Sequence, residues 1–206
     1  MNNVPNPGLD SIHSALSDAP GLPFRQHWLK TPEPDFTPGT VKIGRKANCL
    51  MIFAELEDES INATGFPFNF PAFRQCDTFE IFLRAAGAPV YYEFHITPSN
   101  SLLQLRIPIP RPVTTSLNEY YVTKRLFQSR TGIDSDRWEV AVSVPLALLC
   151  GDQPIPDQWT CSFGRYDYKA GVPAPVISST SSHTVRDFHR LAEWGTISFQ
   201  SLPAIE

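Results

Sequence analysis

The stretch that decides the fold class reads RWEVAVSVP at residues 137–145. Its larger apolar members are Trp138, Val140, Val142 and Val144, and they alternate with Arg137, Glu139, Ala141 and Ser143. A period of two predicts a β-strand with one face in a hydrophobic core, because successive side chains of a strand point to opposite faces. Pro145 then predicts a short helical turn through Leu149, since the fixed φ of proline suits a first helical position.

The same period recurs along the chain from Cys49 onward. It predicts further strands over residues 50–56, 78–84, 90–96, 103–107, 159–166 and 194–199. The second and third of these segments form a predicted hairpin, because a turn at residues 86–89 joins them. Helical periodicity is nearly absent. We therefore expect an all-β fold, either an antiparallel β-sandwich of two sheets, like an immunoglobulin domain or a jelly roll, or a closed barrel.

The beginning of the chain differs from the rest in its proline content. Residues 1–38 are predicted to form an extended, proline-rich N-terminal arm, because proline fixes φ and removes a hydrogen-bond donor. One edge strand and a short helix at residues 9–16 are expected within the arm. Residues 39–206 are predicted to form one sandwich domain, since no linker divides them.

The composition excludes several classes of partner. A chain of 206 residues with 42% hydrophobic and 12% aromatic residues can bury a core without help from a disulfide or a metal ion. The net charge is −4 and the basic residues are scattered singly, so we expect no nucleic-acid partner. No apolar run approaches the length of a membrane span, so no membrane partner is expected either.

The cysteines and the first residues bear on the compartment. Cys49, Cys76, Cys150 and Cys161 form no CxxC pair, and we interpret them as free thiols of a reducing compartment. Residues 1–20 lack the basic start and the apolar stretch of a signal peptide, which predicts a cytoplasmic location. Export remains an alternative if a leader has been trimmed from the chain.

An ordered set of segments carries a resemblance to a known family. The segments are DTFEIFL at 77–83, YYEF at 91–94, WEVAVSVPL at 138–146, WTCSFGRYD at 159–167, FH at 188–189 and WGTISF at 194–199. In this order, over about residues 40–200, they resemble the family-nine carbohydrate-binding modules and the wider DOMON-like group of sandwich domains. The resemblance implies an antiparallel β-sandwich, binding of sugars between aromatic side chains, structural calcium in some members, and no catalysis.

The resemblance also implies roles for particular residues. It places the acid that helps to bind sugar hydroxyls on Glu80. Shortly before that acid the sugar-binding modules have a stacking tryptophan, whereas this sequence has Phe70, Phe73 and Arg74. The second stacking tryptophan has no clear counterpart in the matching late loop, residues 178–183, which ends at His183.

Sugar recognition needs an aromatic face together with planar polar groups that bond neighbouring hydroxyls. The loop at residues 65–75 supplies phenylalanines at positions 66, 68, 70 and 73, which could line such a platform. The alternative is that these rings fold back and fill the edge of the sandwich. Strand alternation places Glu80 on the face that carries Arg84, where it could meet a ligand or solvent. An ion pair of Glu80 with Arg84 or Arg106 is the alternative.

A second group of candidates lies where a late strand runs into its loop. Arg165 and Tyr166 end that strand, and loops of this kind commonly carry binding residues. We predict Arg165 as a polar ligand contact, with a structural ion pair to Asp167 or Glu93 as the alternative. His183 and His189 are too far apart for a compact metal-binding pair and are interpreted as hydrogen-bonded structural residues. The tryptophans at 138, 159 and 194 open strands on core-facing registers, so they are assigned mainly to packing.

Metal binding and catalysis receive little support. The acidic run Glu55, Glu57, Asp58 and Glu59 could offer oxygen ligands to calcium, but its spacing matches no calcium loop and a solvated strand end explains it better. No cofactor is therefore predicted. Glu80 and Glu93 could in principle act as an acid/base pair in glycoside cleavage, but the sequence does not fix their separation, and we do not predict an enzyme.

These observations lead to one main functional hypothesis and two others. The main hypothesis is a non-catalytic carbohydrate-binding protein whose ligand meets Phe70, Phe73, Arg74, Glu80, Arg84, Arg165, Tyr166 and His183. The alternative is a DOMON-like interaction domain that has lost sugar binding and packs a sheet face on a partner or, as a homo-oligomer, on a second copy. A third reading is a small hydrophobic or haem-type ligand inside the sandwich, although Met51 is the only methionine besides the initiator.

Overall fold

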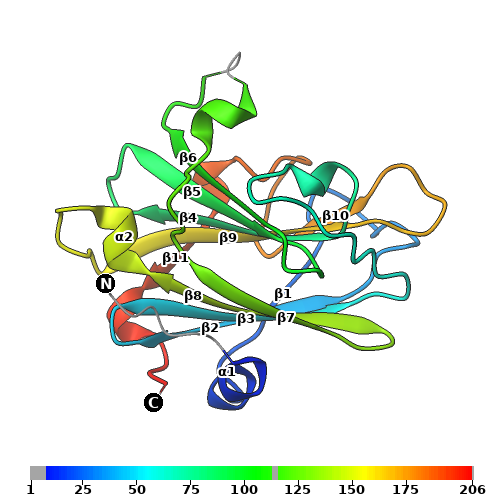
Figure 1. Cartoon of the computed structure of the whole chain (residues 1–206), viewed down its shortest axis with the longest axis horizontal. Coiled ribbons are helices and arrows are strands. Elements are labelled where there is room, and N and C mark those ends of the chain that lie inside the picture. The colour runs from blue at the N-terminus through cyan, green and yellow to red at the C-terminus, as the bar shows by residue number, and fades with distance from the viewer. Residues whose placement is uncertain (1–7, 113–115, 206) are drawn as a thin grey trace.

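Two antiparallel β-sheets lie face to face in the computed structural model, which describes residues 8–112 and 116–205 (Figure 1). The five-stranded sheet has the order β1 (Leu22–Pro23), β2 (Gly39–Lys46), β3 (Cys49–Glu57), β8 (Arg137–Pro145) and β7 (Gln128–Ile133). The six-stranded sheet has the order β10 (Val176–Ser179), β9 (Gln158–Asp167), β4 (Thr78–Ala85), β5 (Val90–Ile96) and β6 (Leu102–Pro108), and β11 (Gly195–Ser198) also pairs with β9. The predicted antiparallel β-sandwich is confirmed.

Short helices complete the chain. The α-helices are α1 (Leu9–Ala15) and α2 (Leu146–Cys150), which follows β8 directly as the proline at position 145 predicted. Among the described residues, 3-10 turns lie at Ala72–Arg74, Leu117–Tyr120, Leu191–Glu193 and Phe199–Ser201. None of the helices within the described ranges has both the length and the apolar character needed to cross a bilayer.

The main core lies between the sheets. On β8 the alternating side chains of Trp138, Val140, Val142 and Val144 are all fully buried in this core. The register aligns Val142 with Ile52 of β3, so apolar side chains of neighbouring strands share the inner face. From the opposite sheet, Phe163 of β9 stacks on Phe79 of β4 with ring centroids 5.9 Å apart. Each such burial contributes about 2–3 kcal/mol, which explains why the period of two decides the fold.

The outer face of the six-stranded sheet carries a second apolar cluster, here called the outer cluster. Its buried members are Phe82, Tyr91, Leu103, Leu105, Ile107, Tyr120, Ile177, Phe188 and Trp194. Trp194 was predicted to face the main core and instead packs here, with its ring 5.6 Å from Phe82 and 5.3 Å from Tyr91. The reason is that Trp194 precedes β11, so the strand register does not fix its direction. Trp138 and Trp159 lie in the main core as predicted.

Helix α1 covers the outer face of the five-stranded sheet (Figure 1). Ile12 and Leu16 pack with Met51 and Phe53 of β3, and the His13 ring stacks on Phe53 at 4.8 Å. A helix of seven residues is marginal in water by itself, so this packing is what holds it. Both outer sheet faces are thus covered, at least in part, by other segments of the same chain.

Three strands were not predicted from the sequence. Strand β2 precedes Cys49, where the alternating pattern was first recognised, although its own burial alternates over residues 39–43. Strand β7 lies at a sheet edge and has no fully buried residue, so it lacks the alternation of apolar side chains. Strand β10 is only four residues long and half of it is serine. The N-terminal segment is also tied to the sandwich: Leu22 of β1 pairs with Val41, and Phe24 is buried in the main core.

Surface features bear on the remaining expectations. The four cysteines are free thiols, as predicted. The large hydrophobic side chains that are exposed among the described residues come from five separate segments: Leu29, Phe68, Ile133, Val172 and Val185. Self-association through a sheet face stays a prediction, which light scattering would test.

Candidate functional site

A chain of ionisable groups lies on the outer face of the six-stranded sheet. Glu80 of β4 and Glu93 of β5 contact opposite nitrogens of His95: Glu80 Oε1 lies 3.2 Å from Nδ1, and Glu93 Oε2 lies 3.3 Å from Nε2. The other oxygen of Glu93 lies 3.1 Å from His189 Nδ1. The Tyr91 hydroxyl lies 3.0 Å from the same nitrogen. Alternation on β4 and β5 brings Glu80, Tyr91, Glu93 and His95 to one face, and His189 meets them from the loop that follows β10.

Burial and mutual contact shift the pKa values of these linked groups in different directions. Burial raises the pKa of Glu80 to about 7, and the proximity of His95 only partly opposes it. Burial would also raise the pKa of Glu93, but hydrogen bonds from His189 and His95 hold it at about 2. Burial lowers the pKa of His95, yet the two flanking carboxyl groups outweigh it and the net shift is upward. The two carboxyl groups therefore favour the protonated form of His95 relative to a buried imidazole without them.

Aromatic rings close over these groups. Phe73 packs edge-on against His95 at 5.3 Å and against Tyr166 at 5.6 Å, and Tyr166 in turn meets Phe188 at 6.0 Å. Glu80 is only 3% exposed beneath them. The close approach of Phe188 depends on Gly164, because a Cβ there would lie 2.8 Å from the ring.

Several predicted site residues do come together on this face. Phe73, Glu80 and Tyr166 lie in one network, and His183 lies nearby with its ring 5.9 Å from Phe188. His183 is fully buried and contacts Glu193 through Nδ1 at 3.2 Å. These side chains contact one another, so the structure brings them together as a packed layer and leaves Glu80 no exposed surface for a ligand.

Arg165 points to the opposite side of its strand. Its side chain is 1% exposed and donates hydrogen bonds to the carbonyl oxygens of Thr37, Pro38 and Glu57. Nη2 lies 3.2 Å from Asp167 Oδ2 and 3.7 Å from Asp58 Oδ2. The structure thus places Arg165 in the structural ion pair with Asp167 that was the alternative to ligand binding, and does not bring it to the face of Glu80. Alternation decides this, because Arg165 and Tyr166 are adjacent on β9.

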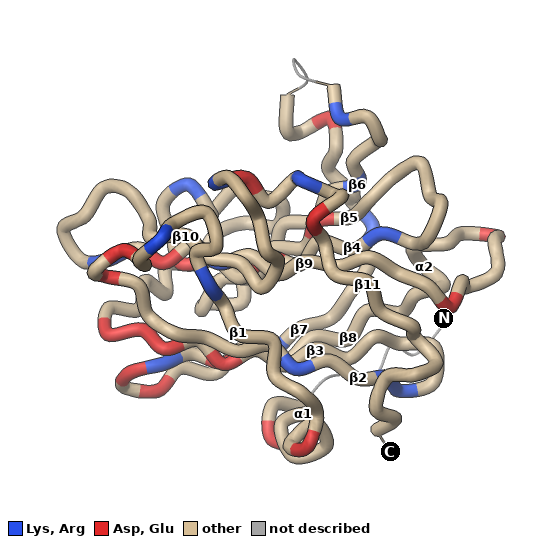
Figure 2. Tube along the Cα trace, turned by 180° about the vertical axis from the view of Figure 1, so that it is seen from behind, with Lys and Arg blue, Asp and Glu red and all other residues tan. Residues whose placement is uncertain are grey.

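Asp167 of this pair belongs to a group of three buried carboxylates, here called the acidic cluster. Ligand atoms of Asp58, Asp77 and Asp167 lie within 4.8 Å of one another. They adjoin the end of the sandwich where acidic positions gather, which Figure 2 shows near the ends of β3 and β7. Of the acidic run at residues 55–59, only Asp58 belongs to the cluster, and Glu57 and Glu59 are exposed.

The resemblance implies calcium in some relatives, and the acidic cluster offers three carboxylates that could be its ligands. Lys169 Nζ lies 2.9 Å from Asp167 and 4.0 Å from Asp58, so Lys169 and Arg165 together offset two of the three negative charges. Asp77 uses its two oxygens to accept the backbone N–H groups of Asn62 and Tyr168. Burial raises the pKa of Asp77 to about 7, which lowers the charge further. The residues as they stand do not fit a calcium ion.

The remaining two arginines lie at the margins. Arg84 Nε donates to the Ala88 carbonyl in the β4–β5 turn, at the far end of the strand from Thr78. Arg74 is exposed, with its guanidinium carbon 5.7 Å from the Phe73 ring centre. Arg84 therefore stabilises a turn, whereas Arg74 is an exposed side chain beside the packed layer.

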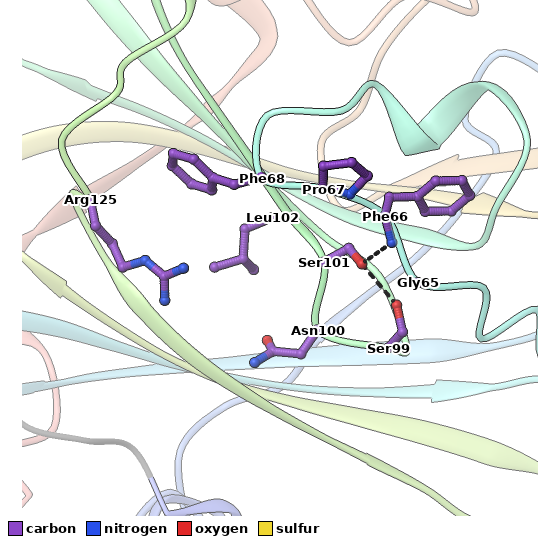
Figure 3. Close-up of a pocket in the computed structure, with 9 residues that line it drawn as sticks. All are labelled: Gly65, Phe66, Pro67, Phe68, Ser99, Asn100, Ser101, Leu102 and Arg125. Atoms are coloured by element: carbon purple, nitrogen blue, oxygen red, sulfur yellow. Dashed lines mark hydrogen bonds between the residues drawn. The ribbon is translucent and has the colours of Figure 1, made fainter.

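The loop at residues 65–75 forms an open hollow on its other side (Figure 3). This hollow, called the Phe68 hollow, has a volume of about 480 Å³. Its lining consists of Gly65, Phe66, Pro67, Phe68, Ser99, Asn100, Ser101, Leu102 and Arg125. Figure 3 shows Phe68, Leu102 and Arg125 along one side and the short polar side chains along the other, with the Phe66 ring turned away.

The aromatic rings of this loop differ in their exposure and in their packing partners. Phe68 is 41% exposed at the rim, with the Arg125 guanidinium carbon 5.6 Å from its ring centre. Phe66 and Phe70 stack on each other, 4.8 Å apart and nearly parallel. Phe73 turns to the packed layer described above. Of the rings predicted to form an aromatic platform, Phe68 is the exposed one, and the others pack on the protein as the alternative interpretation expected.

Hydrogen bonds to β6 and its turn hold the hollow in shape. Asn69 donates its amide to the Val122 carbonyl, and its side-chain oxygen accepts the N–H of Gln104. The Ser101 hydroxyl accepts the N–H of Phe66 at 2.8 Å. Asn100 exchanges two hydrogen bonds with Ser129 of β7. The polar lining was missed from the sequence, where residues 98–100 appeared only as a turn and Arg125 carried no signal.

The architecture and this hollow define a class: a two-sheet β-sandwich with a candidate ligand site formed by loops at its edge. No family model and no curated protein sequence matches the chain. Several solved structures do match the fold of this chain. A candidate carbohydrate-binding protein from Bacteroides uniformis has a TM-score of 0.72 at 16% sequence identity, over 97% of this chain and 94% of that chain.

Two further structures are of a family-nine carbohydrate-binding module from Caldicellulosiruptor kristjanssonii. The complex with glucose has a TM-score of 0.62 at 14% identity, over 94% of this chain and 91% of that chain. The complex with cellotriose has a TM-score of 0.61 at 16% identity, over 96% of this chain and 89% of that chain. The fold is therefore that of the family-nine carbohydrate-binding modules, as the resemblance implied.

Proposed function

We propose that this protein is a non-catalytic carbohydrate-binding protein that holds a saccharide in the Phe68 hollow. The observation that carries the proposal is an exposed aromatic ring beside hydroxyl and amide groups in a hollow of about 480 Å³. A saccharide offers C–H groups on one side of each ring and hydroxyls around its edge, and it needs these two kinds of partner together.

The exposed ring supplies the apolar partner. Phe68 keeps 41% of its surface exposed, although burial of such a ring is favourable. A sugar ring that covered this surface would remove apolar area from water. Arg125 lies over the same ring, so a bound saccharide would lie beside or displace the guanidinium.

The turn between β5 and β6 supplies the polar partners. Ser99 and Ser101 share a hydrogen bond of 3.0 Å, and each hydroxyl can both donate and accept. Asn100 is held by Ser129 through both ends of its amide. Groups that are held in place before binding lose little entropy on binding, which favours useful affinity from a small site.

The lining also favours binding over cleavage. Canonical glycoside hydrolysis uses two carboxyl groups that flank the scissile bond. None of the nine residues that line the Phe68 hollow is acidic. Glu80 and Glu93, the carboxyl pair on the outer sheet face, contact His95 between them and are nearly inaccessible. The fold neighbours in complex with glucose and cellotriose lend the proposal general support.

Calorimetric titration tests the proposal with glucose, cellotriose and a panel of acidic and amino oligosaccharides. We expect saturable binding by the intact protein and a loss of at least about tenfold in affinity for Phe68→Ala. Leu29→Ala is the matched control, because Leu29 is similarly exposed on a different loop. Silence across the whole panel, or equal affinity of Phe68→Ala and the intact protein, would overturn the proposal.

A further inference from the structure

The one charged side chain of the Phe68 hollow carries no counter-charge. Arg125 is exposed and lies over the ring of Phe68, and within the described ranges its guanidinium pairs with no carboxylate. Some other arginines at the surface do have acidic partners: Arg137 meets Asp134 and Glu139, and Arg190 meets Glu193. Arg74 resembles Arg125 in lying over a phenylalanine ring, but it does not line the Phe68 hollow. With no acidic residue in the lining, the guanidinium is the dominant charge of the hollow.

The backbone that carries Arg125 is held on both sides. The buried side chain of Gln104 donates from Nε2 to the carbonyl oxygen of Lys124 at 2.6 Å. Its Oε1 accepts the N–H of Leu126 at 3.0 Å. The residues immediately before and after Arg125 are therefore fixed to β6, and the guanidinium extends from a rigid point over Phe68.

The chemistry of this group selects its ligand. A guanidinium is always charged and offers two parallel N–H groups that match a planar carboxylate. A neutral sugar hydroxyl would accept a hydrogen bond from one such donor and would not neutralise the charge of the guanidinium. The protein as a whole carries a net charge of −4, so attraction of an anion to this hollow must come from the local charge.

We propose that the saccharide of the Phe68 hollow is acidic: a uronic-acid residue whose C6 carboxylate pairs with Arg125 while its ring covers part of Phe68. This inference rests on the proposed function. It goes further by naming the substrate class and the residue that selects it, and Ser99, Asn100 and Ser101 then bind hydroxyls of the same residue.

Calorimetric titration with matched probes tests the inference. Trigalacturonate and trimannuronate are each compared with their fully methyl-esterified forms, which keep the stereochemistry and lose the charge, and cellotriose is the neutral reference. We expect at least one acid to bind about tenfold more tightly than its ester, with an affinity that falls as salt rises. Arg125→Gln should bring the ratio of acid to ester affinity close to one, and Arg125→Lys should retain part of it because it keeps the charge without the fork.

Controls separate the two proposals. Arg106→Gln removes an exposed guanidinium of β6 that does not line the hollow, and it should leave the ratio unchanged. If esters or cellotriose bind as tightly as the acids and Phe68→Ala abolishes that binding, the acidic preference is wrong and the proposed function stands. If acids bind equally to the intact protein and to Arg125→Gln, the assignment of Arg125 is wrong. If no saccharide binds, both proposals are overturned.

Discussion

Arg165 and Asp167 form an ion pair inside the protein, with Nη2 3.2 Å from Oδ2 and both side chains at most 3% exposed. They are two residues apart on β9, so both point to the same inner face. Asp58, Asp77 and Lys169 complete the group. A charge group of this kind, placed where two sheets meet at their ends, is sensitive to the loss of any member.

Replacement of Arg165 should strongly destabilise the protein. Arg165→Met leaves Asp58 and Asp167 buried with only Lys169 to offset them, and we expect a loss of about 3–5 kcal/mol in the free energy of unfolding. Urea denaturation followed by tryptophan fluorescence measures the loss. Arg106→Met, at an exposed position of β6, should change stability by at most about 0.5 kcal/mol. Equal effects of the two substitutions would contradict the role given to the ion pair.

Removal of divalent cations should leave the intact protein unchanged, because Arg165 and Lys169 already meet the charge of the acidic cluster. We expect the same Tm in excess EDTA and in excess calcium. In Arg165→Met the Tm should instead rise with calcium, since Asp58 Oδ2 and Asp167 Oδ1 accept no hydrogen bond and would become available as ligands. A calcium-dependent Tm of the intact protein would show that the cluster binds the ion as it stands.

Glu80 should make stability fall as the pH rises. Its pKa is raised from 4.5 to about 7, so the folded protein holds this proton more tightly than the unfolded chain does. The free energy of unfolding should therefore decrease between about pH 4.5 and pH 7, by at most about 3 kcal/mol from this group. The raised pKa of His95 acts in the same direction above pH 6.5.

Glu80→Gln tests this pH dependence, because glutamine resembles the protonated carboxyl and cannot ionise. The free energy of unfolding of the variant minus that of the intact protein should be larger at pH 8 than at pH 5. Denaturation at a series of pH values measures the difference, and Glu119→Gln, at an exposed position, serves as the control. Parallel stability curves for Glu80→Gln and the intact protein would contradict the assignment.

Gly164 should tolerate no side chain. Gly164→Ala would place a Cβ 2.8 Å from the Phe188 ring and 3.2 Å from Glu80 Oε2, and we expect a loss of about 1–3 kcal/mol. Gly65→Ala is the control, because no atom lies within 4 Å of the added Cβ. If the cause is the contact with the ring, Gly164→Ala should cost less in a Phe188→Ala background, and a double-mutant cycle would detect this coupling.

Gln104 should couple the stability of the sandwich to the shape of the hollow. Gln104→Leu leaves the carbonyl of Lys124 and the N–H of Leu126 without their side-chain partner, and the Val122 carbonyl keeps only the hydrogen bond from Asn69. We expect a loss of about 1–3 kcal/mol in stability, together with weaker saccharide binding, because Arg125 would no longer extend from a fixed backbone. If Gln104→Leu is less stable but binds saccharide as tightly as the intact protein, the proposed effect of Gln104 on binding is wrong.

The sequence supported the fold better than the site. In strands β4 and β8 the large apolar side chains of the main core recur every two residues, and that signal is local, although other segments of the chain bury much of the second face as well. Strand β7 could not be found in this way, because an edge strand with partly exposed side chains has no such alternation. The face of Glu80 was assigned correctly by alternation, but its burial was not, because the rings that cover it come from residues 73 and 188.

What the sequence determined by itself is the sandwich: its strands, its turns and the separation of inner from outer side chains follow from the order of residue types along the chain, because successive side chains of a strand point to opposite faces. Only the tertiary structure decided that Phe73 closes a packed layer while Phe68 stays exposed beside Arg125. The physical reason is that the direction of a loop side chain depends on hydrogen bonds to distant segments, here from Asn69 to Val122 and from Gln104 to Lys124, and no local pattern encodes such partners.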